Sequence, residues 1–227
     1  MKRRQLLQSL VPISACSAGC ANIAIESDSE NEPDEREELM SVESTAVSIE
    51  SAIVEQADYE LERDTTFKLT QTITVGDESY LIQAVNDLTE YKRTAELPQT
   101  GSQEIVRLTA VSTPEVEAFS QEIDFIDQVT AEALGNGLQS TYKDVEVDDE
   151  PSDTHLITTF GHETMVAKHE GTAKVEGHSI EIYVHIAETF TESDYITLFG
   201  IYPQILVDKE QGRVLEMMQG IQMEEPP

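Results

Sequence analysis

Four runs of alternating apolar and polar residues follow one another between residues 154 and 203, and they limit the folds open to this chain. Side chains of a strand point to the two faces of a sheet in turn, so a period of two predicts half-buried strands. The runs therefore predict an antiparallel meander. They are THLITTF (154–160), ETMVAKHEGTAKV (163–175), HSIEIYVHIAETF (178–190) and DYITLFGIYP (194–203).

A two-residue turn at Glu176-Gly177 fixes the expected register of the second and third runs, because it pairs Val175 with His178. One face of this hairpin is mostly apolar, and we expect a helix to cover it. Its residues are Ala167, Gly171, Ala173, Ile180, Ile182, Val184 and Ile186, with His169 opposite Val184 as a core or core-edge histidine. The other face is polar and places His185 beside Lys168; its further residues are Glu170, Thr172, Lys174, Glu181 and Tyr183.

Three more strands and three helices are predicted around the meander. The strands are TTFKLTQTITV (65–75), SYLIQAVNDLTEYKRTA (79–95) and EIVRLTAVSTP (104–114), with Gly76-Asp77-Glu78 as a hairpin link between the first two. Apolar residues at helical spacing predict the helices. The first is a short helix capped by Ser48, and the second has Ala131, Leu134, Leu138 and Tyr142 on one face. The third begins at Asp208, with Gln211 in a capping box and an apolar stripe of Val214, Leu215, Met218 and Ile221. The predicted fold class is α+β, a largely antiparallel β-sheet with helices packed on it and a C-terminal amphipathic helix.

The first residues have the composition of an export signal. Lys2, Arg3 and Arg4 are basic, and no charged residue follows until Glu26. The apolar stretch between them is too short for a transmembrane helix, which needs roughly 20 apolar residues. The pair Arg3-Arg4 resembles the start of a twin-arginine export signal. Residues 1–20 are therefore predicted to be a signal peptide.

Two cysteines near the end of this stretch favour a lipid anchor. Ser17-Ala18-Gly19-Cys20 and Ile13-Ser14-Ala15-Cys16 both resemble lipoboxes, in which small residues precede a lipidated cysteine. We favour Cys20 because it leaves a more workable apolar length, and Cys16, with its better upstream Ile13, stays the alternative. A buried N-terminal helix with incidental cysteines is less favoured, because no cysteine follows Cys20. The protein is thus expected at the outer face of the cytoplasmic membrane, with a domain that no disulfide supports.

An excess of carboxylates limits the environments in which this chain can work and the partners that it can bind. The chain has 45 acidic and 14 basic residues, a net charge of −31. Loss of Lys2, Arg3 and Arg4 with the signal would leave 11 basic residues (14 − 3) and a charge of −34. This balance excludes nucleic acid as a partner, and it excludes attraction to an anionic membrane surface by charge. It is typical of a protein that works in concentrated salt, and with twin-arginine export it indicates a salt-loving archaeon.

The same composition divides the chain. Residues 21–45 are rich in acidic residues and are predicted to be a flexible tether between the lipid and the domain. Apolar periodicity then continues to residue 222, so we expect a single α+β domain over 46–222 and a short tail over 223–227.

Several motifs in this domain resemble those of a known family. They are STPEVE (112–117), the helix that ends at Tyr142, FGHETMVAKHEGTA (160–173), IEIYVHI (180–186) and FGIYP (199–203). With the lipobox-like start, the chain resembles a haloarchaeal lipoprotein family of unknown function, the domain-of-unknown-function 6517 family, over roughly residues 42–222. Ser17 and the glycines at 135 and 137 depart from the family pattern. No catalytic or binding residues are established for the family, so the resemblance implies none here. The order of elements also resembles, less closely, the Mog1/PsbP-like α/β sandwich, which is a likeness of fold alone.

The five histidines give no pattern of a metal or catalytic site. His155, His162 and His169 are spaced by seven residues, as are His178 and His185. Residues seven apart on a strand point to opposite faces, so these histidines would not share a metal ion. Motifs of the type H-E-x-x-H, G-x-S-x-G and D-x-[DN]-x-[DN]-G are missing from the sequence. We predict no catalytic, metal or cofactor-binding residues, and we expect packing roles for the histidines.

The sequence thus predicts a lipid-anchored, non-catalytic cell-surface domain, a binding or assembly module of the envelope whose partner is an unidentified envelope protein or small ligand. The alternative is a solute- or cation-binding lipoprotein that serves a transporter, which a concave apolar pocket would favour. A hydrolase is third, and a Ser–His–carboxylate cluster would favour it.

Overall fold

The computed structural model describes residues 39–75, 78–98, 101–118, 121–123, 125, 128–129 and 141–224. Their helices are α1 (Ser51–Ala57) and α3 (Val207–Gln219), with the 3-10 turn η1 (Gln204–Leu206) before α3. Their strands are β1 (Leu39–Glu43), β2 (Val47–Ile49), β3 (Glu60–Val75), β4 (Glu78–Leu97), β5 (Gly101–Pro114), β6 (Val116–Ala118), β7 (Gln121–Ile123), β8 (Lys143–Val147), β9 (Asp153–Thr159), β10 (His162–Val175), β11 (His178–Phe190), β12 (Asp194–Pro203) and β13 (Ile221–Met223).

Nine of the described strands form one sheet in the order β1-β4-β5-β12-β11-β10-β8, with β3 on β4 and β9 on β10. Its pairings within the described residues are antiparallel, apart from the parallel pair β1–β4. The α+β class, the seven predicted strands and the meander are confirmed. The hairpin register is confirmed as well, because Val175 pairs with His178 and His169 pairs with Val184.

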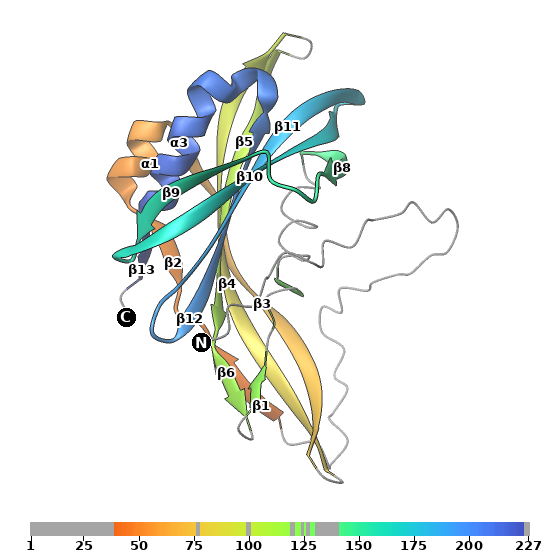
Figure 1. Cartoon of the computed structure of the whole chain (residues 1–227), viewed down its shortest axis with the longest axis vertical. Helices are drawn as coiled ribbons and strands as arrows, with labels where there is room; N and C mark the ends of the chain where they lie inside the picture. The colour runs from red at the N-terminus through yellow and green to blue at the C-terminus, as the bar shows by residue number, and fades with distance from the viewer. Residues whose placement is uncertain are drawn as a thin grey trace, which may run out of the picture. The chain divides into compact units, whose positions relative to one another are not determined.

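Both helices lie on one face of this sheet, and Figure 1 shows α1 beside α3 there. A Cβ atom at Gly200 of β12 would lie 2.4 Å from Val214 Cγ1 of α3, so glycine permits the close approach of this helix. Gly200 pairs with His185, and His185 pairs with Lys168. The helix α3 therefore covers the polar face of the hairpin, and the expectation that a helix covers the apolar face was wrong. The reason is that both faces are buried here, so their polarity alone does not identify the helix side.

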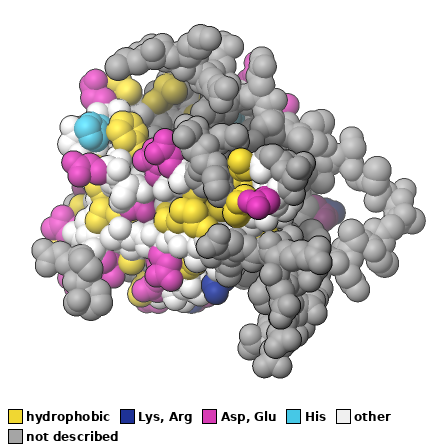
Figure 2. Space-filling model, turned by 90° about the horizontal axis from the view of Figure 1, so that it is seen from below, with side chains coloured by type: hydrophobic (Ala, Val, Ile, Leu, Met, Phe, Trp, Pro, Cys, Tyr) yellow, Lys and Arg dark blue, Asp and Glu magenta, His cyan; other side chains and the backbone are white. Residues whose placement is uncertain are grey.

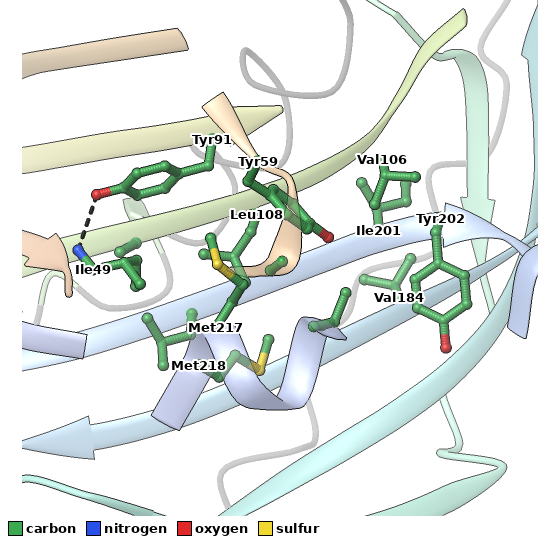
Figure 3. Packing of buried hydrophobic residues seen from close by; sticks show 14 of the residues in the cluster. Ile49, Tyr59, Tyr91, Val106, Leu108, Val184, Ile201, Tyr202, Met217 and Met218 are labelled. Carbon is green, nitrogen blue, oxygen red and sulfur yellow. Dashed lines mark hydrogen bonds between the residues drawn. The ribbon is translucent and has the colours of Figure 1, made fainter. Parts of the chain in front are cut away.

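Apolar side chains close the opposite face as well. One cluster on that side combines residues of β4, β5 and β12 with residues after β5. Its buried members are Ile82, Ala84, Leu88, Val111, Val116, Ile123, Phe125, Val129 and Phe199. Figure 3 shows the packing beneath the helices, where Met217 of α3 lies beside Leu108 and Tyr59, and Met218 belongs to the same cluster. The sheet thus has core on two sides, which explains the long buried runs in β5 and β12.

Three alternate side chains of β4 hold the backbone of β2. Val47 N donates to Asp87 Oδ1 at 3.1 Å, Thr89 Oγ1 donates to Val47 O at 2.6 Å, and Ile49 N donates to Tyr91 Oη at 2.9 Å. The last of these bonds is drawn in Figure 3. The other edge of β2 pairs with β13. The side chains therefore replace a neighbouring strand, and they keep polar backbone groups satisfied in the interior.

The long strand β4 has different neighbours along its length. Residues 81–85 pair with β1, and residues 87–97 pair with β5 on the same edge. The strand β3 follows the other edge from Glu60 to Val75. Figure 1 shows the β3–β4 hairpin running past the helices toward the end of the domain at which β1 lies.

Several predicted boundaries change. The strand β1 lies inside the segment 21–45 that was predicted as a tether, so the folded part includes Leu39–Glu43. Ser48 belongs to β2, while α1 follows Glu50 without a side-chain cap. The helix α3 also has no side-chain cap, so the capping box was wrong. The signal, Cys16, Cys20 and residues 130–140 of the predicted middle helix lie outside the described residues. Within those residues, no helix is long and apolar enough to cross a membrane.

Candidate functional site

A cluster of polar side chains lies between the meander and α3, and it contains the most buried histidine of the α3 face. His185 is fully buried, and its Nε2 atom lies 2.9 Å from Tyr202 Oη, at hydrogen-bond distance. Its ring stacks on Tyr202 with 5.5 Å between ring centroids, and on His155 with 6.0 Å. The pKa of His185 is lowered to about 3, mainly by burial and to a smaller extent by the neighbouring His155 and Lys168. Burial also raises the pKa of Tyr202. A neutral imidazole therefore packs against a neutral phenol.

Lys168 completes the cluster from β10. Its Nζ atom donates to Gln211 Oε1 of α3 at 2.9 Å and lies 3.8 Å from the ring centroid of Tyr183. Only 8% of Lys168 is exposed, so the amide and the aromatic ring replace water around the ammonium group. The predicted neighbour relation of Lys168 and His185 is confirmed by their pairing. The contact also gives the side chain of Gln211 a role, because it binds Lys168 of the sheet and does not cap the helix.

The five histidines do not converge on one point. His155 Nε2 lies 3.6 Å from Asp153 Oδ2, which is beyond hydrogen-bond reach. His169 is fully buried on the other face, as predicted, with Nδ1 2.9 Å from the carbonyl oxygen of Asp148. His162 stacks on Phe190, and His178 is exposed. Within the part of the chain that the structure describes, no three His, Cys, Asp or Glu side chains could hold one metal ion.

Two buried carboxylates each bind two arginines. Glu90 Oε1 accepts from Arg107 Nη1 at 3.1 Å, and Glu90 Oε2 lies 3.0 Å from Arg63 Nη2. Glu210 Oε1 accepts from Arg93 Nη1 at 2.9 Å and from Arg213 Nη1 at 3.0 Å. A buried carboxylate needs such partners, because desolvation without them is unfavourable. The arginines of the described residues are therefore engaged in internal pairs and are poor candidates for binding an anionic ligand.

Two surface pockets are lined mainly by polar and charged side chains. The first has a volume of about 460 Å³ and is lined by five carboxylates, from Glu43, Glu115, Glu117, Glu192 and Asp194. Asp194 accepts from Ser193 Oγ at 2.6 Å and from Thr45 N at 3.3 Å, so it serves the local fold. The second, of about 580 Å³, lies beside Arg107 and Glu104. Neither is the concave apolar pocket that would favour a solute-binding protein. Figure 2 shows that Asp and Glu outnumber Lys and Arg on the face seen from below and lie among hydrophobic side chains.

Part of the outer edge of β3 lacks the carboxylates that are frequent elsewhere in this acidic chain. Residues 65–75 contain no Asp or Glu, whereas the start of β3 includes Glu60, Glu62 and Asp64. Phe67, Leu69 and Ile73 point inward and pack against the cluster on the face away from the helices. The alternate residues are exposed, and they are Thr66, Lys68, Thr70, Thr72 and Thr74. Within the described ranges, β3 pairs with β4 and with no other strand. Among the described residues, β3 is therefore an edge strand, and no strand pairs with its second row of backbone groups.

Comparison with known proteins identifies a family. The family model "Domain of unknown function (DUF6517)" matches residues 46–222. The chain belongs to this family. No curated protein matches it. Among solved structures, this DUF6517 domain is similar to PA94 from Pseudomonas aeruginosa, a protein of unknown function, at 13% sequence identity and a TM-score of 0.29 over 70% of this chain and 99% of that chain. Similarity at this level says nothing about function.

Sequence reasoning on the DUF6517 domain missed the Arg–Glu pairs and the hydrogen bonds from β4 to β2. A weak signal for the first was present, since Glu90 and Arg107 interrupt runs that become buried strands. Asp87, Thr89 and Tyr91 alternate along one face of β4, but nothing local to them indicates that the partner lies about 40 residues earlier. Both sets of contacts depend on which strands meet in the folded chain.

Proposed function

We propose that this DUF6517 domain is a non-catalytic binding or assembly module, exported and held at the outer face of the cytoplasmic membrane by a lipidated cysteine. The observation that carries the proposal is the acid-free stretch 65–75 of β3, an edge strand among the described residues, in a chain of charge −31. Proteins usually protect a long edge strand with charged residues, proline or a covering element. Residues 65–75 have one lysine as their only charged residue and no proline, which favours a strand that binds another strand.

The use of polar side chains inside the domain supports a non-catalytic role. The groups suited to acid–base chemistry in the α3 cluster are His185, Tyr202 and Lys168, and each is bound to another side chain of the fold. A general base must reach a proton on a substrate. Burial of His185 beneath α3 is a poor arrangement for that purpose.

The proposed lipid anchor rests on the sequence of the first residues. Arg3 and Arg4 would direct export, and Cys20, or alternatively Cys16, would carry the lipid. Between Cys20 and β1 lie residues 21–38, or 18 residues (38 − 20), which are rich in carboxylates. This segment would hold the domain away from an anionic membrane in the salt-rich surroundings of a haloarchaeon.

We also propose that the fold is a Mog1/PsbP-like sandwich. An experimental structure of this domain that superposes poorly on those sandwiches would disprove this assignment.

Fractionation of a haloarchaeal host that produces the full chain tests the anchor. Cys20→Ser should move the protein from the membrane to the soluble fraction, whereas Cys16→Ser should leave it in the membrane. Release by Cys16→Ser alone would assign the lipid to Cys16. Membrane retention of both variants would contradict a lipid anchor.

Crosslinking in the same intact cells tests the binding role. The wild-type chain should give an adduct larger than the monomer with an amine-reactive crosslinker. The double change Thr70→Glu/Thr72→Glu should abolish this adduct, because it places carboxylates on the β3 edge. The same double change at Thr154 and Thr158, which are exposed on the edge strand β9, is the matched control and should preserve the adduct. No adduct from the wild type, or equal adducts from both variants, would contradict the proposed function.

A further inference from the structure

We infer that the occupant of the β3 edge is the β3 strand of a second copy of this chain, paired antiparallel about a two-fold axis at Thr70. The inference deepens the proposed binding role and rests on it. A two-fold arrangement lets one edge serve both copies, and it joins two sheets into a single continuous sheet.

The first support is the distribution of charge over the sheet edges. Two copies of a chain with net charge −31 repel each other, so contact is most favourable where carboxylates are missing. The other edge strands among the described residues carry carboxylates within their short lengths: Glu43 on β1, Asp144 and Glu146 on β8, and Asp153 on β9. The carboxylates of β3, from Glu60, Glu62 and Asp64, all lie in its first five residues, and the eleven residues from 65 to 75 carry none. Like charge therefore opposes self-association at the other edges more than along residues 65–75 of β3.

The second support is the length of the open edge. The part of β3 that would pair about Thr70, residues 65–75, has eleven residues, against 7 in the whole of β9 and 5 in the whole of β8. Each further residue in a ladder adds backbone hydrogen bonds to the pairing. The inward side chains Phe67, Leu69 and Ile73 are only half-buried in one copy, so a second strand beside them would cover more apolar surface.

The third support is the register. With Thr70 opposite Thr70 of the second copy, Lys68 faces Thr72, and Thr66 faces Thr74. Threonine pairs across neighbouring strands are stabilising. The two Lys68 residues are then offset by four residues, or about 13 Å at 3.3 Å per residue. This distance exceeds the Debye length of about 10 Å at 0.1 M salt. Parallel pairing in register would instead place the two lysines side by side, so antiparallel pairing is favoured.

A disulfide across the axis tests this register. Facing residues of an antiparallel pair have Cα atoms about 4.5–5.5 Å apart, within the range of a disulfide. The full chain with Cys16→Ser, Cys20→Ser and Thr70→Cys should form a covalent dimer on mild oxidation in molar potassium chloride. The matched control carries Thr66→Cys in place of Thr70→Cys. Its two cysteines would lie eight residues apart along the strands, or about 26 Å, so it should stay monomeric on a non-reducing gel.

Light scattering of the full chain completes the test. We expect a dimer for the wild type and for Thr154→Glu/Thr158→Glu, and a folded monomer, by circular dichroism, for Thr70→Glu/Thr72→Glu. Equal crosslinking of the Thr70→Cys and Thr66→Cys chains, or none in either, would overturn the inference. If the wild type is monomeric but its β3-dependent adduct in cells contains a different protein, the inference fails and the proposed binding role stands. If no adduct forms in cells either, both fail.

Discussion

The region beneath α3 and the β3 edge differ in how their polar groups are placed. Under the helix, Lys168, His185 and Tyr202 are bound to side chains of the same domain, and water is largely excluded. Along β3, one row of backbone groups pairs with β4, and among the described residues no strand meets the other row. The first region therefore serves stability, and the second is the edge that we propose for contact with another molecule.

The arginines sharpen this contrast. Every arginine of the described residues, namely Arg63, Arg93, Arg107 and Arg213, contacts Glu90 or Glu210. An acidic chain that uses its arginines on interior carboxylates has few cations left to neutralise surface carboxylates. Solvent cations must then screen the surface, while the interior pairs are largely independent of salt.

The largest effect should come from salt. We expect the midpoint of thermal unfolding to rise as potassium chloride increases from about 0.1 M to several molar. Surface carboxylates about 4 Å apart repel by roughly 1 kcal/mol in water, and many such pairs rival a net stability of about 5–15 kcal/mol. At 1 M salt the Debye length falls to about 3 Å, so most of this repulsion is screened. Circular dichroism checks the trend. A flat or falling midpoint would contradict adaptation to salt and, with it, the haloarchaeal origin proposed above.

The next effect should come from the interior pair of Arg107 and Glu90, whose side chains are 5% and 4% exposed. Arg107→Met should lower the free energy of unfolding by about 3 kcal/mol, the lower end of the range for a broken buried pair, because Glu90 loses its buried partner and keeps the more exposed Arg63. Arg63→Met is the control: Arg63 contacts the same carboxylate but is 40% exposed, so the loss should be about 1 kcal/mol or less. Urea unfolding at constant molar salt measures both. Equal losses would show that burial does not decide the strength of these pairs.

Acid should destabilise the region beneath α3 through His185. The pKa of His185 is about 3 in the folded chain because of burial, against about 6.5 when the chain is unfolded. The unfolded chain therefore binds more protons between these values, and the free energy of unfolding falls as the pH drops below 6.5. At pH 5 the loss from this residue should be about 2 kcal/mol relative to pH 7. His185→Gln should remove this part of the pH dependence in urea unfolding. An unchanged profile would show that His185 does not stay neutral in the folded domain.

The smallest effect should come from one hydroxyl on β4. Tyr91→Phe leaves the buried amide of Ile49 without its acceptor, which should lower the free energy of unfolding by about 1–2 kcal/mol. Tyr80→Phe is the matched control, because Tyr80 lies on the same strand in the projecting hairpin and its hydroxyl donates to exposed Glu78. We expect a change within about 0.5 kcal/mol for Tyr80→Phe. A loss as large as that of Tyr91→Phe would remove the distinction between the two regions.

The sequence alone determined the strands and the local pairings. Alternation of apolar residues predicted β9 to β12 within a residue or two of their observed ends, and the turn at Glu176-Gly177 set the β10–β11 register. These features depend on neighbours along the chain, since side-chain period and turn length are local properties. The charge imbalance is equally a property of the sequence, and it led to the expectation of a salt-rich environment.

Only the tertiary structure decided which groups meet across the fold. It placed α3 on the polar face of the hairpin, where Gly200 gives Val214 room and Gln211 binds Lys168. It also brought β1 beside β4 and paired Arg93 with Glu210 across 117 residues of sequence. Where both faces of a sheet are buried, polarity does not distinguish them, and the choice depends on side chains that fit and neutralise one another. The open edge of β3 has the same origin, because an edge exists only once the order of all strands is fixed.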